Sequence, residues 1–318
     1  MQRILQPGEI EALDRTNFPR ILLPQPATLF QARAARLRQL ADGHPIADYL
    51  RFAARVVEAQ HQQAAQLPAA EPLAGELIRR ANANGMPLMP TSELLPAGWQ
   101  AVLRAIVTSL RSDAAVPAAL HPVLDQLAAA GDATLDASAR QVLADNLGRE
   151  DLAAAPLVMA ALQVVFAQRA AGVPEAVVPY AEPATVCPVC ASAPVASVLR
   201  IGGQAGGHRY LHCSVCATEW HMVRVKCSHC ESTEGVRYQG MQAAEEAAGA
   251  QPTAQVVLAE TCDRCHTYRK LVDQEKDPYA EPVADDLAAI TLDLLMGESA
   301  FARASGNPLL AIERPLLA

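Results

Sequence analysis

The chain has 318 residues, of which 51% are hydrophobic and only 4% are aromatic. Its net charge of −8 argues against a nucleic-acid-binding protein, which would carry a basic surface. The length suffices for two domains, each with its own core, and close-packed helices are expected in the Ala- and Leu-rich first half.

Residues 1–25 are expected to form an extended arm that prolines interrupt, with at most one helical turn near residues 9–13. Charges and Pro7 stand where a secretory signal needs an apolar run, so no signal peptide is expected. The most hydrophobic run, residues 157–167, is too short to cross a bilayer. Cysteine pairs without such a signal indicate reduced thiols and hence the cytoplasm.

An all-α domain is predicted through residue 172. Segment 152–170 is apolar nearly all round, which is typical of the central helix of a bundle. Asp136 or Ser138 is expected to cap a helix that ends at Leu147. The other main predicted helices begin at Thr28 as a cap, at Pro45 (to Leu67), at Ala74 (to Ala83) and at Trp99 (to Leu110).

The first of these helices has a simple amphipathic pattern. Its apolar face would consist of Phe30, Ala34 and Leu37. Its arginines are expected in solvent: Arg33, Arg36 and Arg38.

The proline-rich stretch 172–183 is expected to be a stiff extended link between domains. Beyond the cysteine-rich region, one C-terminal helix is predicted from Val283 to Leu295, with Asp285 and Asp286 in its first turn. Residues 307–318 are expected to form a tail.

All eight cysteines stand in four Cys-x-x-Cys pairs. A two-residue gap lets one tight turn aim both sulfurs at one point, and two such turns supply the four thiolates of a tetrahedral zinc or iron site. Structural disulfides are the disfavoured alternative. The eight cysteines therefore predict two tetrathiolate metal sites.

An internal repeat favours sequential pairing of these turns. The first two pairs are 22 residues apart (191–212), the last two are 31 apart (231–261), and only ten residues (217–226) link the halves. Each half has two β-like runs, 195–201 and 209–212 in the first, 235–238 and 254–260 in the second. A cross-braced arrangement, in which the first and third pairs share an ion, is the alternative. The predicted ligands are Cys187, Cys190, Cys213 and Cys216 at site 1, and Cys227, Cys230, Cys262 and Cys265 at site 2.

Rubredoxin turns usually place Gly directly after their second cysteine, where the backbone needs a positive φ. The four residues at these positions here either adopt a left-handed conformation or belong to a different turn: Ala191, Ala217, Glu231 and His266. His212 and His266 adjoin cysteines and are expected beside the sites rather than as ligands. Four thiolates leave no open coordination position, which argues against metal-assisted hydrolysis.

Segment 209–231, RYLHCSVCATEWHMVRVKCSHCE, closely resembles the accessory (maturation) proteins of formate dehydrogenases, the FdhE family. ETCDRCHTY at 260–268 and GHPIADYL at 43–50 agree with it, and the resemblance covers nearly the whole chain. The predicted fold is α+β. It has a helical domain (1–180), two tandem rubredoxin-like, zinc-ribbon-like modules within 181–275 (about 184–224 and 225–275), and a C-terminal helix and tail (276–318).

The resemblance implies a non-catalytic cytoplasmic protein that is needed for formate dehydrogenase activity and binds the catalytic subunit of that enzyme before export. It favours iron slightly over zinc at both sites. Neither nucleic-acid binding nor membrane insertion is expected, and the chain is compatible with a homo-oligomer. The alternatives are a rubredoxin-like electron carrier that acts on the same client, and a zinc-ribbon nucleic-acid-binding protein, which the charge disfavours.

Overall fold

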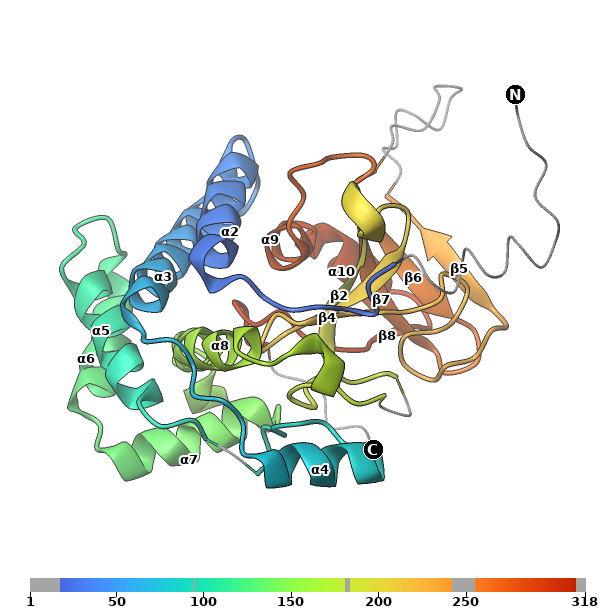
Figure 1. The fold of residues 1–318 in the computed structure, drawn as a ribbon. Helices are drawn as coiled ribbons and strands as arrows, with labels where there is room; N and C mark the ends of the chain where they lie inside the picture. The colour runs from blue at the N-terminus through green and yellow to red at the C-terminus, as the bar shows by residue number, and fades with distance from the viewer. Residues whose placement is uncertain (1–17, 94, 181–183, 242–254, 313–318) are drawn as a thin grey trace, which may run out of the picture.

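Helices on one side of the molecule pack against a mixed β-sheet on the other, which confirms the predicted α+β class (Figure 1). The computed structural model describes residues 18–93, 95–180, 184–241 and 255–312. The helical turn expected near residues 9–13 lies outside these ranges. In the part of the chain that is described, no helix has both the length and the apolar character that crossing a bilayer requires.

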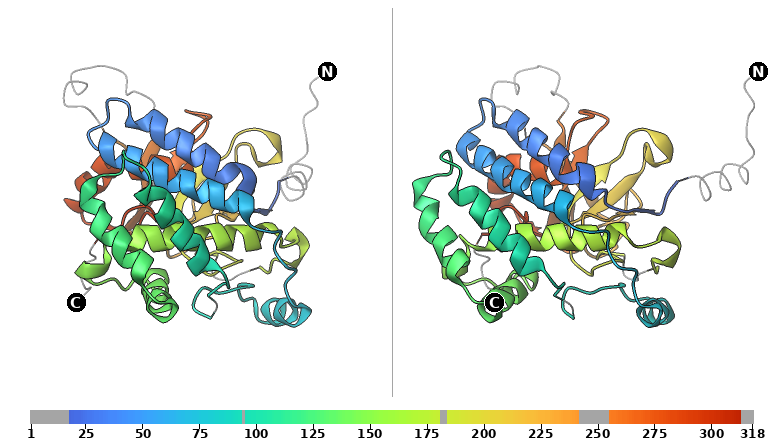
Figure 2. Two further views of the ribbon diagram at one scale, coloured as in Figure 1. Left: turned by 90° about the vertical axis from the view of Figure 1, so that its left-hand side faces the viewer. Right: turned by 60° about the vertical axis from the view of Figure 1, so that its left-hand side comes forward.

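The helical side is built around α8, whose apolar residues pack against neighbours in every direction. α2 and α3 lie side by side above it (Figure 2). α5 packs against α3, α6 and α8, and α7 packs against α8. The bounds are α2 Pro26–Ala41, α3 Ala47–Gln66, α4 Gly75–Asn84, α5 Trp99–Arg111, α6 His121–Ala129, α7 Asp132–Leu143 and α8 Ala155–Ala171. The predicted central helix is thus confirmed, but it begins at Ala155 rather than at residue 152.

Three other predicted helix starts were also wrong. α2 begins at Pro26 rather than after Thr28, because the fixed φ of proline suits the first helical position. α3 begins two residues after Pro45. α7 starts at Asp132 and ends at Leu143, and Asp136 caps nothing, because its carboxylate accepts hydrogen bonds from the Trp99 and Gln100 side chains.

The sheet has the strand order β1-β4-β3-β2-β7-β6-β5, with β8 also paired to β7. Neighbours are antiparallel except β2 with β7 and β7 with β8. The bounds are β1 Ile21–Leu22, β2 Pro194–Leu199, β3 Arg209–Cys213, β4 Glu219–His221, β5 Val236–Gln239, β6 Val257–Cys262, β7 Thr267–Asp273 and β8 Ala302–Arg303. The four β-like runs of the sequence thus correspond to β2, β3, β5 and β6.

The two halves of the cysteine-rich region join through the parallel pair β2–β7, where Ser197 is opposite Leu271. The apolar core does not divide as expected. One cluster runs from Phe30 and Leu162 in the helices to Cys187 and Trp220 in the first module. The first module thus shares its core with the helices, because a module this small cannot bury enough apolar area alone.

The predicted C-terminal helix is two helices, α9 (Pro282–Ala288) and α10 (Ile290–Gly297). The backbone leaves the helical region at Ala289, with ψ of 31°. The carbonyl of Asp286, which Ile290 would use in a continuous helix, instead accepts a hydrogen bond from Lys270 Nζ at 2.6 Å. After this break, Leu294 on α10 is 69% exposed.

The predicted tail and link also differ. Asn307 is buried and its amide donates to Val283 O at 2.9 Å, so the tail packs on α9 at least as far as this segment. The link contains a short 3₁₀ helix, Glu175–Val177, between the buried Val173 and Val178. Both segments therefore belong to the packed structure.

Candidate metal centres

The structure brings the eight sulfurs together in two groups of four. Within each group all sulfurs lie within 4.8 Å of one another. In the first, Cys187 Sγ is 3.5 Å from Cys216 Sγ, and Cys190 Sγ is 3.4 Å from Cys213 Sγ. The corresponding distances in the second are 3.8 Å (Cys227–Cys265) and 3.7 Å (Cys230–Cys262). Sequential cysteine pairs thus share each group, as in the tandem rather than the cross-braced arrangement.

Each Cys-x-x-Cys turn has the geometry of a rubredoxin knuckle. The residues after the second cysteines all have positive φ: Ala191 67°, Ala217 56°, Glu231 60° and His266 51°. Backbone N–H groups point at the sulfurs, as those of Val215 and Cys216 do toward Cys213 Sγ, both at 3.4 Å. Of the two possibilities that the missing glycines left open, the left-handed conformation is the one adopted.

The donor sets fit a tetrahedral metal ion. Sulfurs bound at 2.3 Å around zinc would be about 3.8 Å apart, close to the distances observed. Burial, with the neighbouring thiols, raises the pKa of Cys187 and Cys213, so a bound cation would be needed to hold these two sulfurs as thiolates. All eight cysteines are free thiols rather than disulfides. Each group can therefore hold one zinc or iron ion.

The two groups differ in their access to solvent. All four cysteines of the first are buried. In the second, Cys230 is exposed and Cys265 half-buried, whereas Cys227 and Cys262 are buried. The cause is packing: the first group lies within the large apolar cluster, whereas the second module has only a small cluster around Ala259 and Tyr268.

The helical domain covers both knuckles of the first group. Backbone N–H groups of Leu88, Met89 and Thr91 donate to carbonyls of residues 188–190 at 3.3, 2.8 and 3.0 Å. On the second knuckle, Gln163 Nε2 of α8 donates to Ser214 O at 2.7 Å. No sequence pattern indicated that segment 88–91 would pair with a knuckle.

His212 belongs to a buried charge network rather than to a metal site. Its Nδ1 is 2.7 Å from Glu219 Oε1, and Arg200 also pairs with Glu219. Burial favours the neutral form of Glu219, but Arg200 and His212 outweigh it and lower the pKa of this carboxyl to about 2. Arg33, also buried, approaches His212 Nε2 at 3.5 Å and binds Glu281 at 2.9 Å. The expectation that Arg33 and Arg36 stay in solvent was wrong.

A second network lies between the modules. Arg209 of β3 is fully buried and binds Ser197 and Glu260. Arg269 Nε donates to Ser228 Oγ, inside the third knuckle, at 2.9 Å. Burial lowers the pKa of Arg269 to about 10 despite the nearby Glu260. These groups fix the second module against the first.

Three sequence models of one family match the chain. They are "FdhE, N-terminal" over residues 18–182, "FdhE, central domain" over 186–224 and "FdhE, C-terminal domain" over 225–310. The chain belongs to the FdhE family. The resemblance noted in the sequence is thereby confirmed.

Relatives of this FdhE-family chain agree over nearly their full length. A "Protein FdhE homolog" of Edwardsiella ictaluri is 43% identical over 292 residues, 91% of each chain. One of Cronobacter sakazakii is 39% identical over 313 residues, 97% of each. The crystal structure of the FdhE protein from Pseudomonas aeruginosa matches with a TM-score of 0.80 and 36% identity, covering 92% of this chain and 99% of that one.

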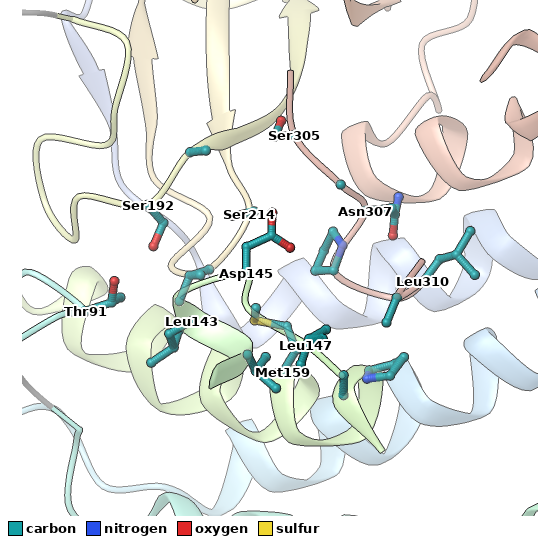
Figure 3. Close-up of a pocket in the computed structure, with 18 of the residues that line it drawn as sticks. Thr91, Leu143, Asp145, Leu147, Met159, Ser192, Ser214, Ser305, Asn307 and Leu310 are labelled. Atoms are coloured by element: carbon teal, nitrogen blue, oxygen red, sulfur yellow. The ribbon is translucent and has the colours of Figure 1, made fainter. Parts of the chain in front are cut away.

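Two hollows adjoin the first metal centre. The first is a cavity of about 220 Å³. Its lining, shown in Figure 3, includes Ser192 and Ser214 beside the cysteine turns, Asp145, Met159 and the segment 305–312. It is smaller than the roughly 300–1,000 Å³ of sites that enclose small molecules. A cleft of about 830 Å³ lies between α2, β4 and residues 278–282, and the Glu219 network forms part of its wall.

Proposed function

We propose that this protein is an accessory factor for the maturation of formate dehydrogenase and that it catalyses no reaction itself. FdhE-family membership over nearly the whole chain is the observation that carries the proposal. The two cysteine groups agree with it, because four thiolates around one ion leave no coordination position for a substrate.

In this role the protein binds the catalytic subunit of formate dehydrogenase in the cytoplasm, before that subunit is exported. Eight free thiols suit a reducing compartment. The net charge of −8 makes a nucleic-acid partner a poor match. Self-association, which the sequence allows, is decided by measuring the mass of the purified protein.

Each cysteine group is proposed to bind one ion, iron or zinc. Cys187, Cys190, Cys213 and Cys216 would hold the first, and Cys227, Cys230, Cys262 and Cys265 the second. A bound ion would cross-link two knuckles and neutralise their thiolates. The residues around each group orient the sulfurs, through N–H donors such as those of Val215 and His229.

The test combines a cellular and a biochemical measurement. In a bacterium that lacks its own family member, this chain should restore formate dehydrogenase activity, and anaerobically purified tagged protein should capture the catalytic subunit. The double variant Cys213→Ser/Cys216→Ser should fail in both assays. Arg79→Gln, at a residue 72% exposed on α4, is the control and should behave like the unchanged protein. If the unchanged chain is folded and metal-loaded but neither restores activity nor captures the subunit, the proposal is wrong.

The exposure of Cys230 supports a second candidate, electron transfer to the client. An iron–thiolate centre exchanges electrons most easily where a ligand reaches the surface, and the first centre lacks such a ligand. This function needs iron. Zinc-loaded protein that supports maturation as well as iron-loaded protein would exclude it.

A further inference from the structure

The second cysteine group has a ligand that external molecules can reach. Cys230 is exposed and forms part of an open hollow. The hollow is lined by Cys230, Glu231, Ser232, Thr233, Glu234 and Arg264. The equivalent position in the first module is Cys190, which is also the second cysteine of its knuckle and is 0% exposed.

The backbone around these two cysteines differs in the same way. Cys190 O accepts a hydrogen bond from Thr91 N at 3.0 Å. The N–H groups of Leu88 and Met89 donate to the two preceding carbonyls of the same knuckle. Detaching Cys190 from an ion would therefore require the helical domain to separate from the knuckle. Among the described residues, no other segment forms a comparable row of backbone hydrogen bonds with the Cys227–Cys230 knuckle. Detaching Cys230 requires only a local movement of the exposed end of the turn, residues 229–230, while Arg269 still holds the buried Ser228.

We propose that the second centre exchanges its metal ion with external thiols through Cys230, whereas the first centre keeps its ion as long as the protein stays folded. This inference does not rest on the maturation role. The exchange begins with a ligand substitution: the incoming thiol binds the ion as a thiolate, its proton passes to the Cys230 thiolate that leaves, and no electron is transferred. The other three cysteines are then replaced by further thiols in the same way, beginning with the half-buried Cys265, until the ion leaves.

The ligand class is a thiol, from either a small molecule or a cysteine pair of another protein. Full-length reduced protein carrying two zinc equivalents is mixed with a chromogenic zinc chelator, alone, with glutathione, or with a peptide that contains one Cys-x-x-Cys. One equivalent should leave in a fast phase that accelerates with thiol concentration. The other should leave at least about 100-fold more slowly, on unfolding. Whichever thiol accelerates the fast phase more identifies the source.

Two variants assign the phases. Cys230→Ser should lose the fast phase and keep one slowly released equivalent. Cys190→Ser, the matched change in the first module, should lose the slow phase. If that variant does not fold, limited alkylation of the unchanged protein with N-ethylmaleimide decides the question, because Cys230 should be modified before any cysteine of the first centre. Release of both equivalents at one rate, a fast phase that thiols do not accelerate, or first alkylation at the first centre would overturn the proposal.

Discussion

The guanidinium of Arg36 on α2 and the carboxylate of Asp285 on α9 form a bidentate ion pair. Arg36 Nη2 is 2.6 Å from Asp285 Oδ1, and Nε is 2.9 Å from Oδ2. Their side chains are only 5% and 3% exposed. The pair thus joins the N-terminal helices to the segment that follows the metal modules.

Removing one partner of this pair should destabilise the protein strongly. In Asp285→Ala the buried Arg36 keeps only the more exposed Asp277, 2.8 Å away, so the free energy of unfolding should fall by up to about 3–5 kcal/mol. Denaturant unfolding of metal-loaded protein measures this. The double change Arg36→Met/Asp285→Leu should recover much of the loss, because it removes both charges. Arg38→Met is the control. Arg38 lies on the exposed face of α2 and pairs with Glu58 of α3 at the surface, so the loss of this pair should cost less than about 1 kcal/mol.

The left-handed residues of the knuckles offer a stabilising change. Ala191 has a φ of 67°, a conformation that costs a non-glycine residue about 1–2 kcal/mol. Ala191→Gly should relieve that cost, less the extra entropy that glycine gives the unfolded chain, for a net gain of roughly 0.5–1 kcal/mol. Thermal unfolding at fixed metal content is the measurement. Ala161→Gly, inside α8, should instead destabilise the protein, and a loss of stability in both variants would contradict the argument.

The His221 imidazole should remain neutral in mildly acidic solution. Its ring centroid is 4.3 Å from that of Phe18, and burial, with the charges of His208 and Arg209, lowers its pKa to about 4. The unfolded chain binds this proton near pH 6.5, so stability should fall as the pH drops from about 6.5 to about 4. An NMR titration of the histidine rings measures the pKa. His221→Phe should have a shallower pH dependence of unfolding, and a His221 resonance that titrates near pH 6.5 would refute the prediction.

Local chemistry made the cysteine groups predictable. A Cys-x-x-Cys turn places its own two sulfurs, and the repeated strand pattern indicated which turns face each other. The central position of α8 was equally predictable, because a helix that is apolar on all sides is stable only in the interior of the protein. These features depend on residues close together in the chain.

The features that were missed depend on distant partners. Arg33 lies at i+3 from Phe30, within the stripe that Ala34 and Leu37 continue, so its burial was visible in the spacing. Its charge argued for solvent, because Glu281, 248 residues away, could not be anticipated as its partner. The break between α9 and α10 was hidden for the same reason, since it depends on the ammonium of Lys270.

Gln163 links the helical bundle to the first metal centre, and its loss should affect both. Its Nε2 donates to Ser214 O at 2.7 Å, and its Oε1 accepts from Gln60 Nε2 at 3.0 Å. In Gln163→Met the half-buried Ser214 carbonyl loses this donor and the buried Gln60 amide loses an acceptor, which together should cost about 1–3 kcal/mol of unfolding free energy. The second knuckle would also be held less firmly, so the slowly released zinc equivalent should leave faster while the fast phase is unchanged. Gln168→Met is the matched control, because this amide on the same helix donates to Pro68 O at 2.9 Å in a solvent-exposed bond. Equal effects of the two substitutions, or acceleration of the fast phase by Gln163→Met, would show that α8 does not secure the first centre.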